Sequence, residues 1–170
     1  MNLTADIGNT LVKIGLFNGD ELLKNLSYPD ISQKTINELQ KEYPDIDSAI
    51  ISDVTGNKTK LERVFRKIPH AVFLDAKTKL PFINNYGTPS SLGTDRLSLV
   101  AGAMKYFHGK NVLVISAGTC ITYDFISRKK EYSGGSISPG MRMRLAALNH
   151  FTARLPLVNP KAMKIKSGST

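Results

Sequence analysis

The chain has 170 residues, enough for one large domain or two small ones, and its hydrophobic content of 41% is ordinary for a globular protein. No apolar run approaches the roughly 20 residues that cross a bilayer, and no signal-like segment precedes the first strand-like run, so we expect a cytoplasmic protein without a membrane partner. The formal charge of +9 comes without the aromatic interleaving of nucleic-acid modules, which favours solvated basic faces and anionic small ligands over nucleic acid.

The first half of the chain predicts a sheet with two helices. Apolar runs separated by short polar turns predict a three-stranded meander. Helices and strands then alternate, which implies that parallel strands extend the meander. The predicted strands are 3–7, 11–17, 21–26, 48–52 and 71–74, and the predicted helices are 31–43 and 58–67. We assign residues 1–88 to this first domain.

The second half repeats the pattern after a loop. Residues 77–94 are rich in Pro, Asn, Gly, Thr and Ser, which is typical of a connection or an active-site loop. A helix is predicted over residues 95–107, followed by a second meander and by a last helix launched at Pro139-Gly140. The meander strands are 112–115, 120–126 and 131–137. We expect an α/β fold whose second domain, residues 89–170, is incomplete and would continue past Thr170.

Two short turns of similar sequence are the most informative feature. Asp6-Ile7-Gly8-Asn9-Thr10 and Ser116-Ala117-Gly118-Thr119-Cys120 each lie between two strand-like runs, and the second follows the first by 110 residues. A glycine in such a bend lets the backbone approach an anion, while neighbouring hydroxyl and N–H groups point into the same concavity. Two such bends facing each other would clamp a polyphosphate, whereas one alone is more simply explained as a tight turn.

Asp6 ends the first strand, where its carboxylate would meet a cation bound to that polyphosphate. Mg²⁺ takes one or two protein carboxylates together with phosphate oxygens and water. Lys13 lies on the next strand and could reach a phosphate oxygen. The alternatives are a turn-capping aspartate and a lysine on an exposed strand face.

A second polar group opens the helix predicted at residue 95. Asp95 could accept a proton from a substrate hydroxyl, and Arg96 could hold a carboxylate through two parallel hydrogen bonds. Phosphoryl transfer requires little more from a protein than positioning of the two substrates and neutralisation of the phosphate charge. Thr94 and Asp95 also suit the start of a helix on their own, because a capping hydroxyl and a first-turn acid favour the helix dipole.

Taken in chain order, four motifs resemble type III pantothenate kinases. They are Asp6-Ile7-Gly8-Asn9-Thr10 with Lys13, Gly93-Thr94-Asp95-Arg96, Ala117-Gly118-Thr119 with Thr122 and Asp124, and Gly134-Gly135-Ser136-Ile137-Ser138-Pro139-Gly140. The resemblance implies the duplicated, ribonuclease H-like fold of the actin, sugar kinase and acetate kinase superfamily, with mixed sheets flanked by helices. It also implies ATP-dependent phosphorylation of pantothenate, the first step of coenzyme A synthesis.

The same resemblance assigns residues to ligands. The ATP phosphates and Mg²⁺ would be held by Asp6, Ile7, Gly8, Asn9, Thr10 and Lys13, with Asp6 as the metal ligand, and by Gly118 and Thr119 of the second turn. Pantothenate would be held by Tyr86, Gly93, Thr94, Asp95 and Arg96, with Asp95 as general base for its primary hydroxyl. Members of the family work as homodimers with substrate contacts across the interface, and they require a monovalent cation such as K⁺ or NH₄⁺.

One position departs from the family pattern. Ser116 stands where the family usually places an aspartate before Ala-Gly-Thr, and a neutral hydroxyl oxygen would bind a monovalent cation more weakly. Two alternatives to a working pantothenate kinase therefore stay open. One is a non-catalytic homologue that binds nucleotide or another anionic ligand, and the other is a small-molecule kinase with a different acceptor.

Overall fold

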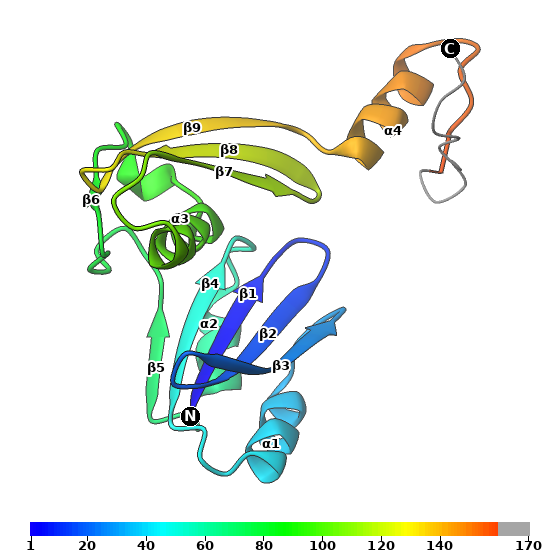
Figure 1. Cartoon of the computed structure of the whole chain (residues 1–170). Coiled ribbons are helices and arrows are strands. Elements are labelled where there is room, and N and C mark those ends of the chain that lie inside the picture. Colours follow the sequence, from blue (N-terminus) through cyan, green and yellow to red (C-terminus); the bar gives the residue numbers. More distant parts are fainter. Residues whose placement is uncertain (160–170) are drawn as a thin grey trace, which may run out of the picture.

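The computed structural model describes residues 1–159, which form two mixed sheets with helix α3 (Thr94–Tyr106) between them (Figure 1). The first sheet has the strand order β3-β2-β1-β4-β5. Its strands are Asn2–Ile7 (β1), Val12–Asn18 (β2), Glu21–Tyr28 (β3), Ser48–Asp53 (β4) and His70–Phe73 (β5). β1 pairs antiparallel with β2 and parallel with β4, and β5 continues the parallel part. The predicted meander with its parallel extension is confirmed.

Two helices cover one face of this sheet, α1 (Gln33–Glu42) and α2 (Lys58–Phe65). Alternate residues of β1 point toward them, so Leu3 and Ile7 are buried in one cluster with Ile36 of α1 and Phe65 of α2. Burial of each such side chain contributes about 1.5–3 kcal/mol to folding. The alternate residues of the strands, Asp6 among them, face the opposite side of the sheet, where no helix of the first half lies.

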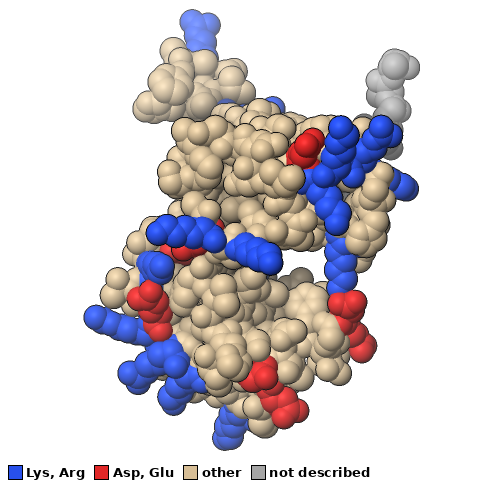
Figure 2. All heavy atoms as spheres, turned by 90° about the vertical axis from the view of Figure 1, so that its left-hand side faces the viewer, with Lys and Arg blue, Asp and Glu red and all other residues tan. Residues whose placement is uncertain are grey.

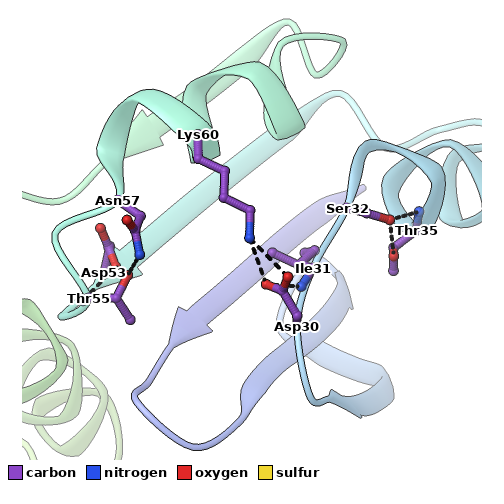
Figure 3. Close-up of polar contacts among 8 residues, drawn as sticks. All are labelled: Asp30, Ile31, Ser32, Thr35, Asp53, Thr55, Asn57 and Lys60. Carbon is purple, nitrogen blue, oxygen red and sulfur yellow. Dashed lines mark hydrogen bonds and ion pairs between the residues drawn. The ribbon is translucent and has the colours of Figure 1, made fainter.

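Short polar contacts fix the starts of these helices and the end of β4 (Figure 3). Ser32 caps α1, because its Oγ accepts a hydrogen bond from the Thr35 backbone N–H at 3.3 Å. Lys60 of α2 reaches across to the Asp30 carboxylate, with Nζ–Oδ distances of 3.0 and 2.9 Å. Asp53, at the end of β4, accepts bonds from the Thr55 backbone N–H and hydroxyl. These bonds hold Asp53 in place at the end of β4, where its backbone N–H contacts Thr94 of helix α3.

The second sheet has the order β6-β9-β8-β7. Its strands are Ile83–Asn84 (β6), Val112–Ala117 (β7), Cys120–Ile126 (β8) and Glu131–Pro139 (β9). β6 was predicted as part of a loop, yet it pairs in parallel with the start of β9. Two residues carry too little periodicity to be recognised as a strand. A boundary between residues 88 and 89 stays a prediction, since the second sheet begins with β6.

Helix α3 packs on this sheet through Leu97 and Val100, which share a core with Ile126 and Tyr132. The last helix, α4 (Met141–Phe151), follows β9 and lies beyond the end of the sheet in Figure 1. Figure 2 shows basic side chains in separate groups over the face that it presents. Within residues 1–159, no helix is long and apolar enough to cross a membrane. The predicted unfinished tail, 161–170, lies outside the described residues.

Candidate active site

A cleft of about 760 Å³ lies between the open face of the first sheet and helix α3. Residues from both halves of the chain line it, among them Asp6, Lys13, Ser52, Asp95 and Ser116. Polar and charged side chains from both halves therefore converge on a cavity whose walls are largely apolar. A concave apolar site with a few convergent polar groups is the arrangement typical of small-molecule binding.

Asp6 and Lys13 face the cleft side by side. They lie opposite each other in the antiparallel register of β1 and β2, and Ser52 lies opposite Asp6 in the parallel register of β1 and β4. Residues opposite each other in a sheet share a face, which explains their convergence. Burial raises the pKa of Asp6, Lys13 lowers it, and the carboxylate of Asp95 raises it again. Two acids from different halves thus share one partly desolvated site, which favours a bound cation.

Asp95 reaches this position because its neighbour ties α3 to the first sheet. The hydroxyl of Thr94 lies 3.0 Å from Ser52 Oγ and accepts a hydrogen bond from the Asp53 backbone N–H at 3.2 Å. Ser52 is only 4% exposed, so this link is shielded from water. The contact holds the first turn of α3 against the end of β4. No sequence signal pointed to Ser52 and Asp53, because the link joins residues about forty positions apart in chain order.

The two glycine turns meet across the halves. Thr10 Oγ1 and Thr119 Oγ1 are 2.9 Å apart, although 109 residues separate them in the sequence. The backbone N–H groups of Gly8 and Gly118 are engaged within their own turns, donating to Leu11 and Cys120 carbonyl oxygens. The exposed hydroxyls of Thr10 and Thr119 are therefore available as donors to an anion between the turns, whereas these two N–H groups are already engaged.

A third link between the halves joins Lys105, in the last turn of α3, to Asp20 in the β2–β3 turn. Both side chains are at least half exposed. Among residues 1–159, side-chain polar links between the halves thus occur at three places: a shielded one at Thr94 and exposed ones at Thr10 and Lys105.

Arg96 does not line the cleft with Asp95. Successive residues of an α-helix differ by about 100° around its axis, so Arg96 turns toward the second sheet. There its guanidinium pairs with Asp124 of β8, with an Nη2–Oδ1 distance of 2.6 Å. Tyr86 lies near this pair and packs against the second core, of which Tyr132 is a member. No role was predicted for Asp124 or Tyr132, whose contacts depend on the tertiary fold.

Metal ligation in the described part of the chain rests on few groups. Among residues 1–159, no cluster of three or more His, Cys, Asp or Glu could hold a metal ion by itself. A cation that takes one or two carboxylates and completes its shell with phosphate and water fits Asp6 beside Asp95.

Known proteins resemble this chain over its length. A type III pantothenate kinase of Christiangramia forsetii is 45% identical over 172 residues, which is 100% of this chain and 71% of that protein. One of Bacteroides fragilis is 43% identical over 160 residues, covering 94% of this chain and 65% of that protein. The chain thus spans roughly two thirds of the length of these relatives.

A solved structure shares the fold. A conserved Baf family protein of Campylobacter jejuni has a TM-score of 0.55 at 21% identity, over 88% of this chain and 60% of that one. The α/β fold predicted from the sequence, with two mixed sheets flanked by helices, is confirmed. The sequence profile of type III pantothenate kinases matches residues 2–170. The chain therefore belongs to the type III pantothenate kinase family.

Proposed function

We propose that this protein transfers the γ-phosphoryl group of ATP to the primary hydroxyl of pantothenate. The observation that carries the proposal is the convergence of Asp6 and Asp95, one from each half, on a single cleft that also holds Lys13. Phosphoryl transfer needs a cation site, charge neutralisation and a base for the acceptor hydroxyl. These three side chains supply the corresponding chemistry.

The nucleotide is held by the two glycine turns. Residues 6–10 and Lys13 take the phosphates from the first half, and Gly118 and Thr119 take them from the second. Thr10 and Thr119 exchange their mutual hydrogen bond for bonds to phosphate oxygens. Asp6 ligates Mg²⁺, which neutralises phosphate charge when it is bound. The raised pKa of Asp6 supports this role, because its ionised form lacks compensation in a partly buried site beside a second acid.

Asp95 is the general base. The acceptor oxygen attacks the γ-phosphorus while its proton passes to the Asp95 carboxylate, and the bond to the ADP oxygen breaks. Thr94 positions this carboxylate through its contact with Ser52 and Asp53. Pantothenate itself is bound by Tyr86 and by residues 93–96. Arg96 contacts it from the side of the second sheet.

A monovalent cation and a second subunit belong to the same proposal. Ser116 lines the cleft with a neutral hydroxyl where the family resemblance places an acid. This donor fits K⁺ less well than a carboxylate, so we assign no step to potassium and expect weak dependence on it. By resemblance to the family, the working form is a homodimer. The neutral Ser116 also favours a second candidate, a homologue that binds both ligands without turnover.

The test is ADP release in the presence of pantothenate, Mg²⁺ and ATP. Asp95→Asn should lower kcat by about 10²–10⁴-fold, the range expected for a lost general base, while the chain stays folded. Asp45→Asn is the matched control, since the Asp45 side chain is exposed and far from the cleft. A parent rate in Asp95→Asn would refute the assignment of the base. Tight binding of both ligands by calorimetry without turnover would select the non-catalytic homologue, and turnover with other hydroxyl acceptors alone would select another kinase.

A further inference from the structure

Arg96 is held in a buried hydrogen-bonded cluster outside the cleft. Its Nε donates to Asp124 Oδ1 at 2.9 Å and to Oδ2 at 3.2 Å, and its Nη2 donates to Oδ1 at 2.6 Å. Asp124 is completely buried, and its Oδ1 also accepts a hydrogen bond of 2.7 Å from the hydroxyl of Tyr132. The carboxylate is therefore neutralised and bonded on several sides, which fixes the plane of the guanidinium.

Tyr132 can only act as a donor in this cluster. Burial first and the hydrogen bond to Asp124 second raise the pKa of its phenol, so the hydroxyl keeps its proton at neutral pH. Its ring is locked as well, because it is fully buried and packs edge-on against Phe82 with ring centroids 5.7 Å apart. Asp124 is thereby held by a rigid partner from the neighbouring strand, β9.

One edge of the guanidinium remains available. In the described part of the chain, the side-chain hydrogen bonds of Arg96 use Nε and Nη2. Thr122 Oγ1 is the one fully buried side-chain nitrogen or oxygen there that lacks a partner. Within residues 1–159, Nη1 of Arg96 has no hydrogen-bond partner and is not among the fully buried unpaired atoms, so it keeps some contact with solvent. This atom is the part of the 8% exposed Arg96 side chain that is left for a further hydrogen bond.

Tyr86 lies in the loop that follows β6, beside the hydrogen-bonded cluster of Arg96, Asp124 and Tyr132. Gly134 of β9 has a φ of 93°, and a Cβ at this position would lie 2.5 Å from the Tyr86 ring. Only a glycine therefore lets the ring lie against β9. Tyr86 and Arg96, both predicted to contact pantothenate, come together at this place.

We propose that Asp124 and Tyr132 are positioning residues that hold Arg96 so that its Nη1 edge binds the carboxylate of the substrate. The inference rests on the proposed function, and it adds residues that orient the carboxylate-binding group. A buried ion pair gains little net stability over a well-packed apolar pair, so a merely structural role explains this arrangement poorly. Orientation of a guanidinium toward an anion does explain it, because paired N–H donors must match the carboxylate plane.

The first measurement compares two acceptors in the folded chain. One is pantothenate, and the other is its neutral alcohol analogue, in which a hydroxymethyl group replaces the carboxylate. In Tyr132→Phe, which keeps the ring and removes the hydroxyl, the preference in kcat/KM for pantothenate over the alcohol should fall about tenfold, through KM rather than kcat. Tyr123→Phe removes a hydroxyl one residue before Asp124, on the other face of β8, and should leave the preference unchanged.

Equal losses for both acceptors in Tyr132→Phe would mean that the cluster is only structural, and an unchanged preference would mean that it does not orient Arg96. Either result would overturn the proposal. Asp124→Asn should lower the preference further, and because this variant removes a buried charge, its fold is checked by circular dichroism before kinetics.

The second measurement separates this proposal from the proposed function. N-acetyl-β-alanine carries the same carboxylate end as pantothenate but has no hydroxyl to phosphorylate. Added to ¹⁵N-labelled protein, it should shift the Arg96 side-chain N–H signals in the parent and in Tyr123→Phe, and much less in Tyr132→Phe. A shift without any pantothenate phosphorylation would leave the inference standing while the proposed function fails. Phosphorylation without a shift would do the reverse.

Discussion

Replacement of Gly93 by alanine tests the placement of the proposed base without changing its charge. Gly93 is the N-terminal cap of α3, with φ −60° and ψ 131°, a conformation that alanine adopts without strain. A Cβ at this position would overlap Oδ1 of Asp95, well inside the 3.4 Å at which ordinary contact begins. The carboxylate must therefore swing away by about 1 Å, a displacement that can cost about 10²-fold in rate, or about 2.7 kcal/mol of transition-state stabilisation.

The assay is steady-state ADP release, with thermal unfolding measured in parallel. Alanine is a poorer cap than glycine, so the free energy of unfolding should fall by only about 0.5–1 kcal/mol. Gly87→Ala is the control, because an added Cβ there meets no atom within 4 Å. A variant with parent kcat and a displaced carboxylate would refute the role of Asp95 as base. A loss of kcat matched by Gly87→Ala would refute the steric reasoning.

Three further outcomes are expected. The pKa of Asp6 is raised above its ordinary value of 3.8 in the folded chain, so the folded state binds this proton more tightly than the unfolded state does. The free energy of unfolding should therefore fall as the pH rises from the ordinary pKa of the carboxyl through its raised value. Asp6→Asn should remove this fall in thermal melts and abolish Mg²⁺-dependent turnover. Thr122→Val should raise the free energy of unfolding by about 1 kcal/mol in urea titration, since Oγ1 is buried without a partner, and a decrease would contradict this. Gly135→Ala should lower it by at least about 1–3 kcal/mol, because a Cβ would overlap the Tyr123 carbonyl oxygen; parent stability would refute the clash.

Local pattern was enough to predict most strands and helices. In both meanders, the strand residues either alternate between apolar and polar or are apolar throughout, and clear turn residues separate the strands. Strand β8 has the predicted bounds of 120–126. The twin turns were found from their similar sequences between strand-like runs and from their constant offset, and the structure brings them together at Thr10 and Thr119. The residue-level ligand roles stay predictions.

Contacts between distant residues could not be predicted from the sequence. Asp95 and Arg96 are neighbours in the chain, and their adjacency suggested one shared site. Helical rotation sends the first into the cleft and the second to Asp124. The link from Thr94 to the end of β4 likewise has no local signature, because it depends on how the two sheets are placed.

The way the two halves are joined has a consequence for ligand entry. The contact at Thr94 is shielded, whereas the contacts at Thr10 and Lys105 are solvent-exposed. An exposed ion pair such as Lys105–Asp20 contributes only about 0–1 kcal/mol and weakens in salt, and an exposed hydroxyl–hydroxyl bond such as Thr10–Thr119 contributes a net of about 1 kcal/mol because water competes for both groups. The Thr10–Thr119 hydrogen bond is therefore replaced at small energetic cost when a nucleotide offers its own oxygens, while the shielded contact at Thr94 keeps the start of α3 against β4.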